Sequence, residues 1–498
     1  MVVVAVAILA SCATSGADGA TDTSHFTGTV DSAGARTQVK SVKVTATGAV
    51  DAVLDWTNTA ADLNVVVKNP AGTVVASSTS RTAKPERVHA VVSTTGTWKF
   101  AVSARTAASD FTLDVTVTSG DPDTSGWDGS IKTWAAENED ARHDWTRDEA
   151  VDQASHFDAI LSSTYPPDYI VSYKDNVAAM KAVNPDLLLM AHVNGSHVWE
   201  HDDRVAWPPE SFLYDANGQK ILQPAWDTWL MNVFDKTWVD RRPNECLEIL
   251  DLTGYDSCYL DSLATWALQG NTAMPINPNT GKQITGPEWL RATTEVAKHF
   301  RAAIAPRVTW GSGGATGAKY FGTSPANAER QLLDGLDASV HEGFCRRPGA
   351  SLDSFYGEAQ WKQDVDMIRD VESHGKYALP LAKTFTTGTM DRKRAVMKYC
   401  LATFLLATNG KSMFGFEFGS GNAMTTDSLW DTVLGAPTSG YAKTDGVYQR
   451  SFADGRVLVN STTTPATVDL GGSYRRPEGT TVTSLALPAH TAEILTKA

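Results

Sequence analysis

Two acidic residues follow short apolar runs in separate parts of the chain. Asp261 ends the run 255–261, and Glu342 follows the run 338–341. If both runs are strands of one barrel, their carboxyl ends meet at one rim, where barrel enzymes hold their reacting groups. An Asp and a Glu across that rim suit cleavage of a glycosidic bond, in which one carboxylate acts on the anomeric carbon and one carboxylic acid protonates the leaving oxygen. The structural alternative for each is a carboxylate that caps a helix.

Other polar and aromatic residues stand at further expected strand ends. Side chains alternate along a strand, so His192 and Asn194 share one face, and Tyr259 shares the face of Asp261. Such groups can bind sugar hydroxyls. The expected substrate-binding residues at strand ends are Trp134, His192, Asn194, Tyr259, Lys383 and Glu417, and Glu137 and Glu417 are competing candidates for the catalytic acid.

A long segment after the third expected strand, residues 195–230, is rich in aromatic side chains: Trp199, Trp207, Phe212, Tyr214, Trp226 and Trp229. We expect at least half of them to pack beneath the segment as a small core. The others, with Trp199 and Trp226 as the candidates, would form a platform for sugar rings, since long connections in compact domains are commonly functional.

Other catalytic chemistries have little support. His192, His197 and His201 lack the HExxH spacing of a zinc site, so neither a catalytic metal nor a cofactor is expected. No G-x-S-x-G elbow of a serine hydrolase occurs. No GxGxxG turn follows the first strand of the central region, which argues against a dinucleotide-binding sheet.

Residues 130–440 must position the acidic pair. Short apolar runs alternate there with amphipathic segments such as 173–183, 287–304, 358–373 and 391–408. Repeated βα units imply a parallel sheet, and eight of them indicate a (β/α)₈ TIM barrel, with an open sheet as the alternative. The expected strands start near Ile131, Asp158, Asp186, Asp256, Arg307, Ala338, Lys376 and Lys411.

The flanking regions differ from this barrel. Residues 25–119 show period-two alternation with frequent turns, typical of an antiparallel β-sandwich, and a linker follows at 120–129. Residues 441–498 again alternate in short runs and predict a small C-terminal β-domain. The chain is therefore expected to be multidomain.

The first 24 residues are predicted to be an export signal followed by a flexible tether. The apolar run Val2–Ala10 is too short to span a bilayer and ends at Leu9-Ala10-Ser11-Cys12, which resembles a bacterial lipobox. No Lys or Arg precedes Arg36, although a signal peptide usually begins with positive charge, so an ordinary apolar N-terminus is the alternative. We expect lipidation at Cys12, an extracellular or cell-surface location, and membrane attachment through that anchor alone.

The other four cysteines lack a zinc-site spacing. Cys246 and Cys258 either form a disulfide, since Cys258 would face the helices around the barrel, or remain thiols, and the sequence leaves both alternatives open. Cys345 and Cys400 are expected to be buried thiols.

The amino-acid composition indicates which kinds of ligand the protein is expected to bind. The chain has 498 residues, of which 42% are hydrophobic and 20% charged, as in a packed globular protein. Its net charge of −14 argues against general nucleic-acid binding, which needs cations to neutralise phosphates. Its 15 Trp residues suit flat, half-apolar ligands such as sugars. We therefore expect a carbohydrate substrate.

The barrel region resembles the glycoside hydrolases of hypothetical glycosyl hydrolase group fifteen. The resemblance rests on the motifs Val183-Asn184-Pro185-Asp186, Gly254-Tyr255-Asp256, Leu260-Asp261-Ser262, Val468-Asp469-Leu470-Gly471-Gly472 and Leu487-Pro488-Ala489-His490-Thr491. The wider α-galactosidase-like superfamily has its nucleophile on the fourth strand and its acid/base on the sixth. The resemblance thus implies Asp261 as nucleophile and Glu342 as acid/base, where those relatives often have Asp.

The N-terminal sandwich resembles the bacterial pre-peptidase C-terminal type of accessory domain, through Val53-Leu54-Asp55-Trp56, Lys68-Asn69-Pro70-Ala71-Gly72 and Gly96-Thr97-Trp98. Together the observations predict an exported glycoside hydrolase of a poly- or oligosaccharide. Retention of configuration is what the superfamily resemblance implies, and inversion stays open because it depends on the separation of the two carboxyl groups. The main alternative is a non-catalytic polysaccharide-binding surface lipoprotein. A peptidase is a third possibility, suggested only by the type of N-terminal domain.

Overall fold

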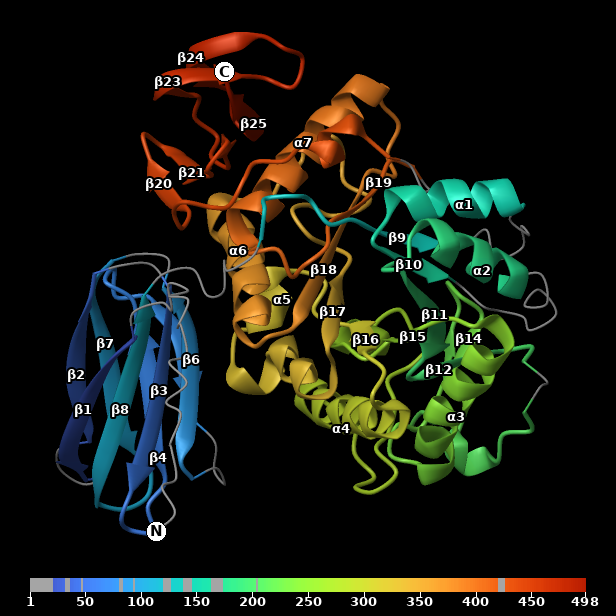
Figure 1. Ribbon diagram of the computed structural model, residues 1–498. Helices are drawn as coiled ribbons and strands as arrows, with labels where there is room; N and C mark the ends of the chain where they lie inside the picture. The colour runs from blue at the N-terminus through green and yellow to red at the C-terminus, as the bar shows by residue number, and fades with distance from the viewer. Residues whose placement is uncertain are drawn as a thin grey trace, which may run out of the picture.

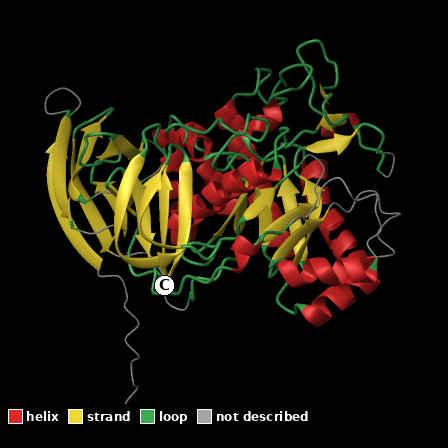
Figure 2. Cartoon of the chain, turned by 90° about the horizontal axis from the view of Figure 1, so that it is seen from above, coloured by secondary structure: helices red, strands yellow, loops and turns green. Residues whose placement is uncertain are grey.

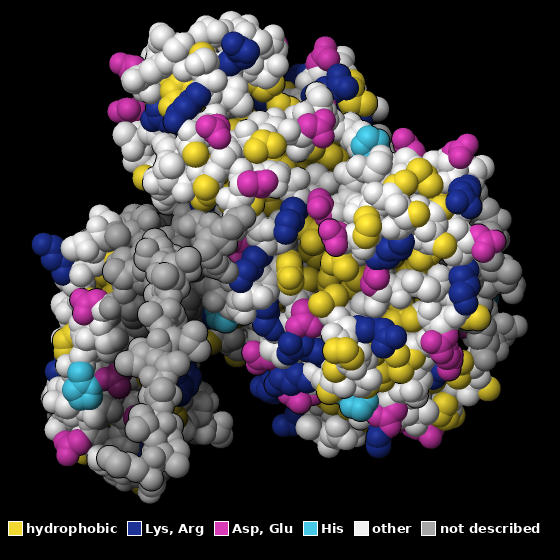
Figure 3. Space-filling view, in the orientation of Figure 1, with side chains coloured by type: hydrophobic (Ala, Val, Ile, Leu, Met, Phe, Trp, Pro, Cys, Tyr) yellow, Lys and Arg dark blue, Asp and Glu magenta, His cyan; other side chains and the backbone are white. Residues whose placement is uncertain are grey.

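Three groups of strands make up the computed structural model, and helices surround only the central one (Figures 1 and 2). The structure describes residues 21–31, 36–45, 48–79, 84–92, 95–119, 127–137, 146–162, 173–202, 205–419 and 426–498. On the face seen in Figure 3, basic side chains are interspersed with acidic ones. Among the helices of these ranges, none is both long and apolar enough to cross a membrane.

The central group is an eight-stranded parallel sheet. A bridge between Thr133 and Phe414, with a 3.0 Å hydrogen bond from Trp134 N to Phe414 O, joins its first and last strands and closes the barrel. The predicted TIM barrel is therefore confirmed. Its strands, in order around the ring, are β9 (Trp134–Glu137), β10 (Ala159–Ser162), β11 (Leu188–Asn194), β15 (Ser257–Asp261), β16 (Thr309–Ser312), β17 (Ala338–His341), β18 (Tyr377–Lys383) and β19 (Gly415–Glu417).

Alternation along these strands divides their side chains between two cores. Tyr259, Trp310 and Val340 point into the barrel and form one buried cluster with Met190 and Leu381. Side chains at the intervening positions face the helices and join a larger cluster. Because both faces are buried, the strands are apolar nearly throughout, as expected of a parallel sheet.

The helices lie where amphipathic segments were expected, with ends shifted by at most one residue. In α4, Thr285 and Glu288 form a capping box at the start, and Trp289, Val296 and Phe300 bury one face. The α-helices are α1 (Arg147–His156), α2 (Tyr173–Val183), α3 (Lys236–Thr253), α4 (Gly286–Ile304), α5 (Gly317–Phe321), α6 (Glu358–Ser373) and α7 (Met390–Ala407). Short 3₁₀ helices are η2 (Pro209–Ser211), η3 (Thr265–Leu268), η4 (Pro325–Asn327), η5 (Glu329–Gly335) and η6 (Ser428–Asp431).

Two disulfides tie barrel strands or their loops to the helices. Of the two alternatives left open for Cys246 and Cys258, the structure has the disulfide, which links α3 to β15. The expectation that Cys345 and Cys400 are free thiols is wrong, because the loop after β17 packs on α7 with a Cα–Cα distance of 5.6 Å and the two cysteines are bonded. That approach joins residues 55 positions apart, which sequence spacing alone does not reveal.

The N-terminal group is the predicted β-sandwich, with Trp98, Phe100 and Leu113 in its core. One sheet contains β1 (Thr21–Val30), β8 (Ser109–Ser119), β3 (Gly48–Trp56) and β6 (Glu86–Val92); the other contains β2 (Thr37–Val44), β7 (Gly96–Ala104), β4 (Leu63–Lys68) and β5 (Val74–Ser78). Residues 21–24, expected in the tether, belong to β1 because they pair with β8. Cys12 and the remaining tether residues lie outside the described residues.

The C-terminal group is the predicted β-domain, a six-stranded sheet. It packs against α7: the buried Arg450 donates to Thr408 O and to Asn409 Oδ1, and Lys398 pairs with Glu493 at 3.1 Å. Its strands, in sheet order, are β20 (Ala442–Thr444), β21 (Val447–Ser451), β22 (Gly455–Asn460), β25 (Thr491–Lys497), β23 (Ala466–Arg475) and β24 (Thr481–Leu487).

Candidate active site

Asp261 is the last residue of β15 and lies at the carboxyl-terminal rim of the barrel. Its backbone is fixed on both sides: Gly195 N donates to Asp261 O at 2.8 Å, and Ser262 adopts a left-handed conformation with φ of 61°. A non-glycine residue in this conformation is uncommon and needs support from its surroundings. Here Asn194 Nδ2 donates to the Ser262 hydroxyl, and Ser196 Oγ donates to its carbonyl.

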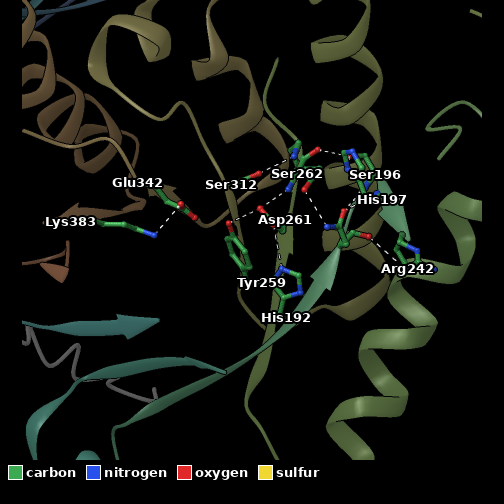
Figure 4. A network of polar contacts seen from close by, with 12 residues as sticks. His192, Ser196, His197, Arg242, Tyr259, Asp261, Ser262, Ser312, Glu342 and Lys383 are labelled. Carbon is green, nitrogen blue, oxygen red and sulfur yellow. Dashed lines mark hydrogen bonds and ion pairs between the residues drawn. The ribbon is translucent and has the colours of Figure 1, made fainter. Parts of the chain in front are cut away.

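The Asp261 carboxylate is bound unevenly. Oδ1 accepts from the Tyr259 hydroxyl at 2.9 Å and from Ser262 N at 2.6 Å, whereas Oδ2 has one longer contact, 3.3 Å to His192 Nε2 (Figure 4). Burial by itself raises the pKa of Asp261, but His192, Ser262 N and Tyr259 outweigh it and hold the pKa below its usual value. The group is therefore an anion at neutral pH, with Oδ2 the less engaged oxygen.

Tyr259 lies beneath this carboxylate inside the barrel. Burial, followed by the negative charges of Asp261 and Glu342, raises the pKa of Tyr259 well above its usual value. The phenol thus stays protonated and acts as a hydrogen-bond donor. Asp261 ends β15 and Glu342 follows β17, so both lie at the carboxyl-terminal rim, and Figure 4 shows Tyr259 between their side chains.

Glu342 comes directly after β17 and is half-exposed, with 51% of its side chain accessible. Lys383 Nζ, at the end of β18, lies 3.3 Å from Glu342 Oε2 (Figure 4). The same nitrogen lies 3.6 Å from Glu417 Oε2 on β19. Burial lowers the pKa of Lys383, but the negative charges of the two glutamates raise it by a larger amount. The pKa of Lys383 therefore lies above its usual value. A buried cation thus joins Glu342 to the buried Glu417.

Residues 179–456, more than half of the chain, match a protein family described as hypothetical glycosyl hydrolase family 15. The chain belongs to this family. It is a glycoside hydrolase, as the sequence resemblance implied. No curated protein matches the chain.

Several solved glycoside hydrolase structures are similar in fold to this family member. An α-amylase from Anoxybacillus is 12% identical, with a TM-score of 0.44, covering 74% of this chain and 97% of that one. The α-galactosidase AgaA from Geobacillus stearothermophilus is 8% identical, with a TM-score of 0.43, covering 92% of this chain and 76% of that one.

Two residues expected to bind substrate in this glycoside hydrolase have other contacts. Trp134 is 1% exposed, packs edge-on against Trp310, and donates to Pro380 O at 3.2 Å, so it fills the barrel and cannot present a ring to a sugar. Asn194 Oδ1 accepts from the backbone N–H groups of Ser196 and His197. Its amide therefore shapes the loop beside Asp261, and a contact with sugar stays a prediction.

The aromatic segment divides as expected. Trp207 and Trp229 are partly buried against a small core that contains Trp238 and Phe212. Trp199 and Trp226 remain 49% and 65% exposed. A role for these two in binding sugar, like the roles of His192, Tyr259, Lys383 and Glu417 toward substrate, stays a prediction.

Two positioning groups were not anticipated. Ser312, the last residue of β16, accepts from Leu263 N at 2.9 Å and so fixes the turn after Asp261; its strand-end position is the signal that could have identified it. His197 is buried beside Asp261, and burial lowers its pKa to about 4 against the opposing charge of Asp261.

No group of three His, Cys, Asp or Glu residues suited to a metal occurs in the described ranges. The Glu137 side chain lies outside the described residues.

Proposed function

We propose that this protein cleaves glycosidic bonds with retention of configuration, using Asp261 as nucleophile and Glu342 as acid/base. The observation that supports this most is the ionised Asp261 carboxylate, whose Oδ2 has a single contact, the 3.3 Å one with His192, at the same mouth as Glu342. Retention needs one carboxylate to form a bond to the sugar and a second group to move a proton twice.

In the first step, Oδ2 of Asp261 attacks the anomeric carbon. The bond from that carbon to the leaving oxygen breaks, and the proton of Glu342 goes to this oxygen, which departs as an alcohol. The Oδ1 bonds from Tyr259 and Ser262 hold the carboxylate plane in place while Oδ2 changes partners.

In the second step, a water molecule attacks the anomeric carbon of the glycosyl ester. Glu342 takes a proton from this water, the ester bond to Asp261 breaks, and the sugar leaves with its original configuration. Lys383, fixed by Glu417, orients the Glu342 carboxylate during both steps.

Asp261→Asn and Glu342→Gln test the assignment, with Asp256→Asn as a matched control. Asp256 is a carboxylate at the opposite end of β15, paired with Lys181 at 2.7 Å. On a polysaccharide that the wild type degrades, we expect each site variant to lose about 10²–10⁴-fold in kcat, and Asp256→Asn to keep its turnover. Near-wild-type rates in both site variants would overturn the assignment, and proton NMR of the first product anomer tests retention.

We also propose that the protein is exported and anchored by a lipid on Cys12. Two disulfides in the barrel support an oxidising location, because such bonds persist mainly outside the cytosol. Expressed in a bacterium fed a labelled fatty acid, the full chain should carry label in the membrane fraction, and Cys12→Ala should not. Equal labelling of both, or of neither, contradicts the anchor.

A further inference from the structure

We propose that aromatic side chains along the barrel rim bind sugars on both sides of the catalytic pair, so that the substrate is a polymeric glycan cut internally. This proposal rests on the proposed function and names the substrate class for the same site. It starts from where the exposed aromatic rings lie.

Five aromatic side chains of the described residues are exposed: Trp199 (49%), Trp226 (65%), Trp266 (36%), Tyr377 (36%) and Phe385 (40%). Four of them, all except Tyr377, lie on connections that leave the carboxyl ends of barrel strands. Tyr377 is the first residue of β18 and lies at the opposite end. Exposed aromatic rings therefore concentrate on the catalytic rim, and clustered exposed apolar surface marks a binding site.

Trp199 ends a strand of a small sheet that follows β11, and Trp226 lies in the turn between the two other strands of that sheet. This sheet consists of β12 (His197–Trp199), β14 (Thr228–Leu230) and β13 (Leu222–Gln223), and a 2.8 Å bond from Glu200 N to Asp227 O joins the ends that carry the two rings. Trp199 shares a face with His197 by alternation. Ser196 Oγ lies 3.0 Å from His197 Nδ1 and donates to Ser262 O at 2.7 Å, so this face of the sheet begins beside Asp261.

Trp266 lies in η3, shortly after Asp261, on a loop bound to the same small sheet. Gln223 Nε2 donates to Gln269 O at 3.1 Å, and Thr272 N donates to Leu222 O at 2.8 Å. The three tryptophans thus belong to one connected layer of loops on the Asp261 side of the mouth.

Phe385 lies on the other side. It comes two residues after Lys383, whose ammonium lies 5.5 Å from the Phe385 ring centroid and 3.3 Å from Glu342. The neighbouring strands β18, β17, β16, β15 and β11 follow one another in this order around the barrel. Phe385 follows β18 and Glu342 follows β17, whereas Asp261 ends β15 and the small sheet with Trp199 follows β11. The aromatic rings therefore flank the two carboxylates on both sides.

This arrangement fits a chain of sugars better than a single sugar. Each sugar ring has an apolar face of C–H groups that can stack on an indole or phenyl ring while its hydroxyls stay in water. An enzyme that removes terminal sugars needs such contacts on only one side of the cleavage point, whereas rings on both sides hold a chain that continues in both directions.

The test compares chain lengths. A panel of soluble starch, dextran, galactomannan, xylan and chitosan identifies the polymer that the wild type cuts fastest, and this polymer and its trisaccharide are the probes. We expect the first products to be long fragments. Trp199→Ala/Trp226→Ala and Phe385→Ala should each raise KM on the polymer about tenfold and raise KM on the trisaccharide by a smaller factor. Tyr377→Ala, an exposed ring at the other end of the barrel, should change neither.

The possible failures are distinguishable. If the wild type releases only single sugars from the start, or the aromatic variants match it on the polymer, the proposal is overturned while hydrolysis stands; the rings would then serve another partner, such as a protein. If no polymer is cut but the polymers still retard the wild type and not Trp199→Ala/Trp226→Ala in affinity gels, the proposed hydrolysis and internal cutting fail and only glycan binding remains.

Discussion

Removing the Tyr259 hydroxyl should shift the pH dependence of catalysis in a direction fixed by the structure. The hydroxyl donates to Asp261 Oδ1 at 2.9 Å, and this bond is one of the contacts that keep the Asp261 pKa low against burial. Tyr259→Phe deletes that donor together with the hydrogen bond between the hydroxyl and Ser312. The pKa of Asp261 then rises, so the nucleophile becomes protonated, and inactive, at a higher pH than in the wild type.

The size of the shift follows from the strength of the lost bond. A hydrogen bond to a charged group contributes about 1.5–3 kcal/mol, and about 1.4 kcal/mol corresponds to one pKa unit. Since Ser262 N and His192 remain, we take the lower end and expect the acid limb of kcat/KM to move up by about one pH unit.

The assay is kcat/KM from about pH 3 to pH 8 on the best polysaccharide substrate. Tyr320→Phe is the matched control, because Tyr320 is a buried tyrosine that donates to a carboxylate, Asp370, at 2.6 Å outside the site. It should lose stability without moving the acid limb. An unchanged limb in Tyr259→Phe, or a shift to lower pH, would refute the reasoning.

Three further outcomes are expected. Lys383→Met removes the cation 3.6 Å from the buried Glu417 carboxylate, so the free energy of unfolding should fall by about 3 kcal/mol; Lys383→Arg should recover part of the loss in thermal melts. Burial raises the pKa of Asp364 to about 7, above its value in the unfolded chain. The contribution of this group to the free energy of unfolding is therefore present at low pH and is lost as pH rises from about 4 to 7. Denaturant titrations should show the free energy of unfolding falling across this pH range in the wild type, and this fall should be absent in Asp364→Asn. Cys345→Ala/Cys400→Ala should lower stability by about 4 kcal/mol, because the bond closes a long loop, and equal melting temperatures would contradict this.

The fold was largely predictable because each barrel strand is a local signal. A short apolar run that ends in a polar residue, such as the run before Asp261, needs no knowledge of its neighbours to be identified. The repeat of such runs with helices between them then implies the closed sheet. Alternation along β15 also placed Tyr259 beside Asp261 and Cys258 toward the helices, as the structure has them.

What escaped prediction depends on contacts between distant segments. Trp134 was placed at the mouth because the first strand was expected to end near it, but in the structure it is the first residue of β9 and its ring lies inside the barrel. The bond between Cys345 and Cys400 needs a loop and a helix to meet. The Lys383–Glu417 contact follows only from β18 and β19 being neighbours, which strand order in space decides.

The two disulfides bear on where the protein can work. Cys258 stands three residues before Asp261, and Cys345 stands three residues after Glu342, so each of the two proposed catalytic carboxylates is close in sequence to a disulfide that links the barrel to its helices. Where thiols stay reduced, both ties are open and the mouth depends on noncovalent packing alone. Oxidation during maturation would therefore complete the catalytic rim as well as strengthen the fold.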